Sequence, residues 1–148
     1  MAACTLDDGG ERPLRIYQGV DLVEVARLRK AYENHEAFGD DIFTREEVEF
    51  CRSRPDVYPH LAGRFAAKEA CLKAFGVGMG GFGATGRFGE IEVESSPSGK
   101  PTLRLHGTME KMGKRLKISQ ASVSISHAGE YAIATVILVG EDTVEEEE

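Results

Sequence analysis

Apolar and polar positions change their spacing along the chain, and each change marks a new element. Residues 15–21 alternate like a strand, whereas apolar residues three or four positions apart over 22–32 predict a helix. The apolar side of that helix, which we expect to face the core, consists of Leu22, Val25, Leu28 and Tyr32. A capping box at Thr44 then predicts a short helix that ends near Arg52.

The second half of the chain predicts one long helix followed mainly by strands. Residues 60–75 contain no proline and are rich in alanine, so they form the longest predicted helix, which Gly76 would end. After a glycine-rich stretch the pattern predicts a hairpin, a short helix and two further strands, at 87–94 with 102–106, at 108–117, and near 123–126 with 131–139. The order β-α-α-α-β-β-α-β-β predicts an α+β fold in which an antiparallel sheet packs against the long central helix.

The length of the chain and its distribution of charge indicate one domain with two loose ends. The chain has 148 residues, and we place the domain at residues 14–140. Residues 1–13 combine acids, glycines and a proline, which predicts a flexible leader. Residues 141–148 hold 6 acids and no base, which predicts a disordered acidic tail. Residues 1–140 then carry 19 acids against 18 bases, so their charge does not favour binding to nucleic acid.

Composition also excludes several classes of protein. The apolar runs are too short to span a membrane, and the first ten residues do not have the pattern of a secretory signal. We therefore expect a cytoplasmic protein without a membrane partner. The three cysteines, Cys4, Cys51 and Cys71, are far apart and form no CxxC pair, which argues against a disulfide framework and a structural zinc site.

The glycine-rich stretch 76–89 matches two nucleotide-binding patterns formally but fits neither. Residues 76–81 read GxGxxG, yet the predicted helix precedes them and a loop follows, whereas a dinucleotide fingerprint needs a strand before it and a helix after it. Residues 81–86 have the glycine spacing of a P-loop, but Arg87 and Phe88 stand where lysine and serine or threonine are required. We interpret the stretch as a flexible loop, with a position beside a ligand pocket left open.

Four residues carry candidate chemistry, and each has a structural alternative. Glu69 lies between an apolar stripe and an alanine stripe of the central helix, with Lys73 one turn later; they are either an ordinary ion pair or a site for magnesium and phosphate. Asp21 ends a predicted strand just before a helix, where it is either a helix cap or a metal ligand. His127 lies where a serine-rich strand turns, and a lone histidine there is more often structural than catalytic.

Four segments together resemble one family, the holo-[acyl-carrier-protein] synthases, which are the short 4′-phosphopantetheinyl transferases. The segments are GVDLVEV at 19–25, RFAAKEA at 64–70 with KAFG at 73–76, GKP at 99–101, and VSISH at 123–127. They occur in the family's order and extend over roughly residues 15–139. The resemblance implies the phosphopantetheinyl transferase fold and a homotrimer with active sites between its subunits.

The resemblance also implies an activity. Such an enzyme transfers the 4′-phosphopantetheine group from coenzyme A to a serine of apo-acyl-carrier protein, releases adenosine 3′,5′-bisphosphate, requires Mg²⁺, and supports fatty acid biosynthesis. The alternative that stays open is a noncatalytic module that binds coenzyme A or a nucleotide with the same fold.

Roles for individual residues follow from the same resemblance. It implies that Asp21 and Glu69 hold the magnesium ion and that Glu69, Lys73 and His127 are catalytic. The positions that match the family's coenzyme A site are Arg64, Lys73, Gly76, Pro101 and His127. Arg27 matches a position that docks the acidic carrier protein, and we expect it on the outer face of the helix over 22–32, remote from the pyrophosphate.

One departure from the family pattern affects the mechanism. Ala128 follows His127, where many relatives have a hydroxyl or carboxylate group. A general base at that position is therefore impossible in this chain, and a metal-bound water or Glu69 itself becomes the better candidate.

Overall fold

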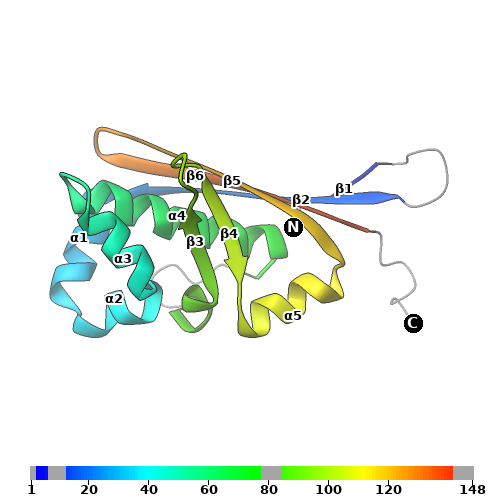
Figure 1. The fold of residues 1–148 in the computed structure, drawn as a ribbon, viewed down its shortest axis with the longest axis horizontal. Helices are drawn as coiled ribbons and strands as arrows, with labels where there is room; N and C mark the ends of the chain where they lie inside the picture. The colour runs from blue at the N-terminus through cyan, green and yellow to red at the C-terminus, as the bar shows by residue number, and fades with distance from the viewer. Residues whose placement is uncertain (1–2, 7–12, 78–84, 142–148) are drawn as a thin grey trace.

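A four-stranded antiparallel sheet forms one side of the molecule in the computed structural model, which describes residues 3–6, 13–77 and 85–141 (Figure 1). Its strand order is β1-β2-β6-β5, with every neighbouring pair antiparallel. The strands are β1 (Ala3–Leu6), β2 (Leu14–Glu24), β5 (Ile118–Ala128) and β6 (Tyr131–Glu141). β2 and β6 pair along their whole length, so they form the long spine of the sheet.

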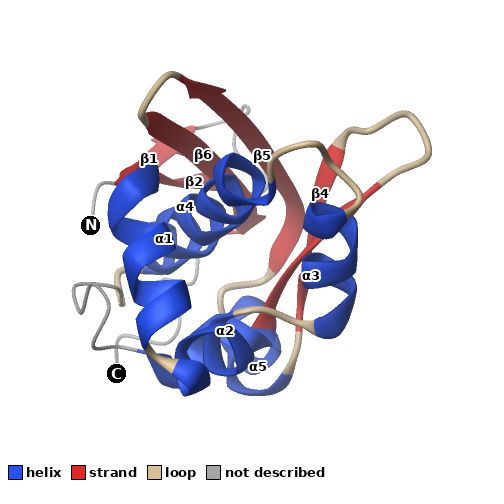
Figure 2. Cartoon of the chain, turned by 90° about the vertical axis from the view of Figure 1, so that its left-hand side faces the viewer, coloured by secondary structure: helices blue, strands red, loops and turns tan. Residues whose placement is uncertain are grey.

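The helices and a second, two-stranded sheet lie on one side of the four-stranded sheet (Figures 1 and 2). The helices are α1 (Val25–Asn34), α2 (Glu36–Ile42), α3 (Arg45–Arg52), α4 (Val57–Phe75) and α5 (Gly107–Arg115), with a 3₁₀ helix at Thr85–Glu90. The hairpin consists of β3 (Ile91–Ser95) and β4 (Pro101–Leu105). This arrangement confirms the predicted α+β class and its antiparallel sheets.

The predicted element order lacked β1 and α2. The prediction of a wholly flexible leader is wrong for Ala3–Leu6, because this segment pairs with β2 along its free edge. α2 has the sequence EAFGDDI, whose glycine and two aspartates are poor helix formers. Burial of Phe38 and Ile42 stabilises it instead. Residues 7–12 and 142–148, where we predicted a flexible leader and an acidic tail, lie outside the described residues.

The boundary between β2 and α1 differs from the prediction. β2 continues to Glu24, so Leu22 belongs to a strand and is 61% exposed rather than turned toward the core. It lies opposite Ile133 of β6, and this cross-strand pairing extends the strand beyond the predicted end at Asp21. Asp21 is therefore no helix cap. Glu24 occupies the cap position of α1 and makes no side-chain capping hydrogen bond.

The central helix α4 is confirmed and is buried on nearly all sides. It begins three residues earlier than predicted, because the Asp56 side chain caps it and Pro59 falls in the first turn, where no intrahelical donor is needed. Gly76 ends it in the left-handed conformation, with φ 79°. α4 is the longest helix, and within the described ranges no helix is long and apolar enough to cross a membrane.

The backbones of α4 and β2 approach each other at Gly19. A Cβ atom added to Gly19 would lie 1.9 Å from the carbonyl oxygen of Ala70 and 2.8 Å from the amide nitrogen of Ala74. Glycine in the strand and alanine in the helix therefore allow a separation that larger side chains would prevent. The same packing brings the end of β2 beside the exposed edge of α4.

Two cysteines lie in the core as free thiols. Cys51 of α3 and Cys71 of α4 are fully buried and form no disulfide. Burial raises the pKa of Cys51 to about 11 and that of Cys71 to about 12. Both thiols are therefore protonated, inert parts of the core at neutral pH.

Candidate active site

Asp21, Glu69 and Lys73 converge where β2 meets α4. The Lys73 Nζ atom lies 2.9 Å from Asp21 Oδ1 and donates a second hydrogen bond, of 3.1 Å, to the carbonyl oxygen of Val20. Asp21 and Glu69 line one cavity of about 280 Å³, although 48 residues separate them in sequence. The structure thus brings together three of the four residues for which the sequence left a choice between a structural and a functional role; His127 is the fourth.

Glu69 is held in an environment that opposes its negative charge. The residue is only 6% exposed. Burial raises the pKa of the Glu69 carboxyl, the nearby Asp21 carboxylate raises it further, and Lys73 partly offsets both. Two carboxylates on one small cavity, one of them nearly buried, form a donor set that suits a hard divalent cation.

A cation held by these carboxylates would need further ligands from outside the chain. Within the described ranges, no group of three or more histidine, cysteine, aspartate or glutamate side chains is placed to hold a metal ion. Asp21 and Glu69 alone would leave most of the coordination shell to water and substrate oxygens. Magnesium usually binds in this way, through one or two carboxylates together with phosphates and water.

Arg27 borders the same cavity. It lines the cavity with Asp21 and Glu69, and it also lines a larger groove of about 490 Å³ with Lys30 and His35. We predicted that Arg27 is remote from the pyrophosphate, but the structure places it on the same cavity as Asp21 and Glu69, to which the resemblance assigns the magnesium ion. The cause is the extension of β2, which starts α1 only at Val25 and places Arg27 in its first turn, next to the strand end.

Arg64 points away from this cavity. It lies nine residues before Lys73 on α4, which at about 100° per residue puts the two side chains roughly 180° apart around the helix axis. Its Nη2 atom donates a 2.8 Å hydrogen bond to Ser95 Oγ, and its guanidinium lies 4.1 Å from the ring centre of Phe50. Arg64 is 5% exposed, and its buried Nε has no hydrogen-bond partner among the described residues.

His127 and Pro101 lie on the Arg64 side of α4. The His127 ring, near the end of β5, meets the His60 ring edge-on with 5.1 Å between their centres. Burial lowers the pKa of His60, and His127 lowers it further. Pro101 lies opposite Ser95 in the β3–β4 hairpin. The residues expected to line one coenzyme A site thus fall into two groups on opposite edges of α4.

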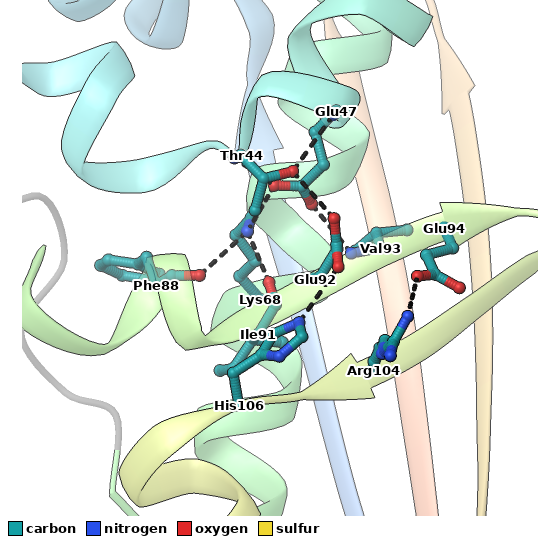
Figure 3. A network of polar contacts seen from close by, with 10 residues as sticks. All are labelled: Thr44, Glu47, Lys68, Phe88, Ile91, Glu92, Val93, Glu94, Arg104 and His106. Carbon is teal, nitrogen blue, oxygen red and sulfur yellow. Dashed lines mark hydrogen bonds and ion pairs between the residues drawn. The ribbon is translucent and has the colours of Figure 1, made fainter.

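Sequence reasoning missed two residues near these groups. His60 lies one helical turn before Arg64, so the four-residue spacing alone places it on the same edge of α4. Lys68 resembles a solvent-exposed lysine in sequence but is fully buried in an ion pair with Glu47 of α3 (Figure 3). No local pattern marks a buried lysine, because its partner is 21 residues away.

Known proteins resemble the chain over most of its length. The family model of the 4′-phosphopantetheinyl transferase superfamily matches residues 18–136. The chain is 37% identical over 127 residues to a holo-[acyl-carrier-protein] synthase of Caldanaerobacter subterraneus, covering 86% of this chain and 97% of the relative. It is 42% identical over 122 residues to the synthase of Ruminiclostridium cellulolyticum, covering 81% and 89%.

Solved structures of the same kind of enzyme have a similar fold. The holo-[acyl-carrier-protein] synthase of Neisseria meningitidis superposes with a TM-score of 0.69 at 31% identity, covering 82% of this chain and 96% of that one. The synthase of Helicobacter pylori in complex with coenzyme A gives a TM-score of 0.67 at 31% identity, covering 82% and 98%.

Proposed function

Because this chain belongs to the 4′-phosphopantetheinyl transferase superfamily, we propose that it is a holo-[acyl-carrier-protein] synthase. It transfers the 4′-phosphopantetheine group of coenzyme A to a serine of apo-acyl-carrier protein. The serine oxygen forms a bond to phosphorus, the bond to adenosine 3′,5′-bisphosphate breaks, and the hydroxyl proton passes to a base. The observation that carries this function is that Asp21 and Glu69 line one cavity while Lys73 pairs with Asp21.

The charges of the cavity suit a pyrophosphate substrate. In the proposed site Asp21 and Glu69 hold a magnesium ion, which when bound supplies positive charge to the pyrophosphate and aligns it. Lys73 lies 2.9 Å from Asp21 with its side chain 41% exposed, so its ammonium can exchange this contact for a phosphate oxygen. Lys73, together with the ion that the two carboxylates would hold, would thereby compensate the negative charge that otherwise repels an attacking oxygen.

Glu69 is also our candidate for the general base. Ala128 occupies the position after His127 and has no group that accepts a proton. Glu69 by contrast has a carboxylate, and it lines the cavity proposed for the reaction. A carboxylate has two oxygens, so Glu69 could accept the serine proton and also help to hold the ion.

We propose that the active site forms between subunits of a homotrimer. One chain cannot direct Arg64 and Lys73 at the same substrate from opposite edges of α4, whereas a neighbouring copy can bring the second group to the first. All helices of the described residues lie on one side of the four-stranded sheet (Figure 1). The alternation of β2 and β6 puts the exposed Val20, Leu22, Ile133 and Ile137 on its other face. Such an apolar face favours burial against another copy. The number three comes from the family resemblance.

The acyl-carrier protein is expected to dock beside the carboxylate cavity. Arg27 and Lys30 place positive charge along the groove of α1, which complements an acidic partner and steers its approach. In this position Arg27 can orient the carrier serine toward the cavity that Arg27 also borders. We assign the protein to fatty acid biosynthesis in the cytoplasm on the basis of this partner.

Mass spectrometry of a carrier protein tests the function. Incubation with coenzyme A, Mg²⁺ and apo-acyl-carrier protein should add one phosphopantetheine to the carrier, and EDTA should prevent the addition. Asp21→Ala should abolish transfer, whereas Glu49→Ala, which removes an exposed carboxylate of α3, should not. Binding of coenzyme A without transfer at any Mg²⁺ concentration would favour the noncatalytic binding module instead.

A further inference from the structure

A buried ion pair joins α3 to α4 behind the proposed active site (Figure 3). The Lys68 Nζ atom lies 2.8 Å from Glu47 Oε1, and both side chains have no exposed surface. Charged side chains are seldom buried this completely, because removing two ions from water costs more than an ordinary surface pair returns. The two residues are 21 positions apart in sequence, so the pair forms only when α3 packs on α4. Its burial therefore calls for a structural explanation.

The pair is the centre of a network in which every donor of Lys68 is used. Besides Glu47, the Lys68 ammonium donates to the carbonyl oxygens of Phe88, at 2.9 Å, and Ile91, at 2.5 Å. Glu47 Oε1 also accepts from the backbone N–H of Thr44, and Oε2 accepts from that of Val93. The network therefore ties α4 to α3, to the 3₁₀ helix and to β3. These contacts hold α4 from one side at a single rotation about its axis.

That rotation determines where Glu69 points. Lys68 and Glu69 are consecutive residues of α4, so their side chains leave the helix about 100° apart. With Lys68 held by three partners, Glu69 is directed to the cavity that it lines with Asp21. A second connection runs through Phe88, whose ring centre lies 5.4 Å from that of Phe65, a residue in the wall of the same cavity. The network thus contacts both the helix and the wall that shape the carboxylate site.

We propose that Glu47 and Lys68 are positioning residues of the transfer reaction, which hold Glu69 in the direction needed to face Asp21. The proposal rests on the proposed function. Arg64, by contrast, has anchors of its own in Ser95 and Phe50, so the coenzyme A contacts on that edge should depend less on the pair. Loss of the pair should therefore reduce turnover and cation binding more than coenzyme A binding.

The double substitution Glu47→Gln with Lys68→Met tests this role. It removes both charges together, keeps an amide oxygen to cap α3 and fills the lysine site with a side chain of similar length, so it should fold. We expect kcat to fall at least tenfold, the KM for coenzyme A to change less than threefold, and Mn²⁺ affinity, titrated by electron paramagnetic resonance, to fall at least fivefold. Each single substitution should unfold at a lower temperature than the double variant, because it leaves one buried charge without its partner.

Two control variants separate positioning from stability. Glu110→Gln with Lys114→Met makes the same changes in an exposed ion pair of α5 and should leave kcat and Mn²⁺ affinity unchanged. Leu138→Ala removes a buried side chain of β6 that does not belong to the network, and should lower the unfolding temperature with kcat retained.

The proposal is overturned if the double variant keeps kcat and Mn²⁺ affinity within twofold of the wild type. It is equally overturned if Leu138→Ala, with an unfolding temperature equal to that of the double variant, loses as much turnover as the double variant. It is also overturned if the double variant changes only the KM for coenzyme A. If the wild type transfers no phosphopantetheine, the proposed function itself is contradicted. Transfer by the wild type is therefore measured before any variant is compared with it.

Discussion

Gly19→Ala changes a residue that touches no substrate yet should inactivate the enzyme. The added Cβ would lie 1.9 Å from the carbonyl oxygen of Ala70, whereas Cβ atoms essentially never approach another heavy atom closer than 3.0 Å. The obstacle is helix backbone, so no side chain can move aside, and α4 must move away from β2 by about 1 Å or more. Overpacking of this kind costs roughly 1–3 kcal/mol, or more where the backbone resists.

The displacement acts directly on the proposed site. Gly19 lies two residues before Asp21 on β2, and Ala70 follows Glu69 on α4, so the clash separates the two carboxylates that should share one cation. A misplacement of about 1 Å can reduce turnover about 100-fold. We therefore expect a loss of activity well beyond what the loss of stability explains.

Thermal unfolding and the transfer assay measure the two effects separately. A cost of 1–3 kcal/mol should lower the unfolding temperature by roughly 3–12 °C in a chain of this size. Gly89→Ala is the matched control, because a Cβ there would meet its nearest neighbour, the carbonyl oxygen of Asp41, at an ordinary 3.6 Å. A Gly19→Ala enzyme with wild-type kcat and an unfolding temperature within 2 °C of the wild type would refute the reasoning.

Three further changes test the charges and the exposed sheet face. Glu69→Gln should abolish transfer yet raise the unfolding temperature at pH 7 in EDTA, because the raised pKa of Glu69 means that its ionised form destabilises the fold. This gain in stability should vanish as the pH falls through the pKa of Glu69. A variant less stable than the wild type at pH 7 would contradict the prediction. Arg27→Glu should raise the KM for the carrier protein at low salt, and less so at high salt. It should also raise the KM for coenzyme A, because Arg27 borders the cavity that Asp21 and Glu69 line. An unchanged KM for the carrier protein would show that Arg27 is not part of the docking surface. Ile133→Asp should convert the assembly to inactive monomers in light scattering, and an active variant with the wild-type mass would argue against the proposed interface.

The parts of the fold that the sequence predicted are those with a local cause. The long helix follows from its alanines, the absence of proline from residues 60–75 and the glycine after it, and the hairpin follows from its alternation and turn residues. α2 and β1 were missed because tertiary contacts stabilise them, through the burial of Phe38 and through backbone pairing with β2. The extension of β2 through Leu22 has the same kind of cause, since β6 provides its partner strand.

In the candidate site, too, some residues have a local signal in the sequence and others are placed only by tertiary contacts. The family motifs singled out Asp21, Glu69 and Lys73. Only the close approach of β2 and α4 at Gly19 explains how Asp21 and Glu69, 48 residues apart in sequence, come to line one cavity. The opposite directions of Arg64 and Lys73 were available from helix geometry alone, because nine residues make two and a half turns. Lys68 was beyond sequence reasoning, since its burial depends on carbonyl oxygens that the chain supplies 20 and 23 residues later.

The buried thiols of Cys51 and Cys71 bear on how the enzyme tolerates oxidation. Coenzyme A and the modified carrier protein both end in a thiol, so oxidised forms of either can exchange disulfides with reactive cysteines. Exchange requires a thiolate, and pKa values of about 11 and 12 leave almost none at neutral pH, while burial blocks access. Cys71 lies two residues after Glu69, where an adduct would force α4 from its place. Through these two positions, therefore, the folded enzyme cannot be trapped as a mixed disulfide by its own substrate.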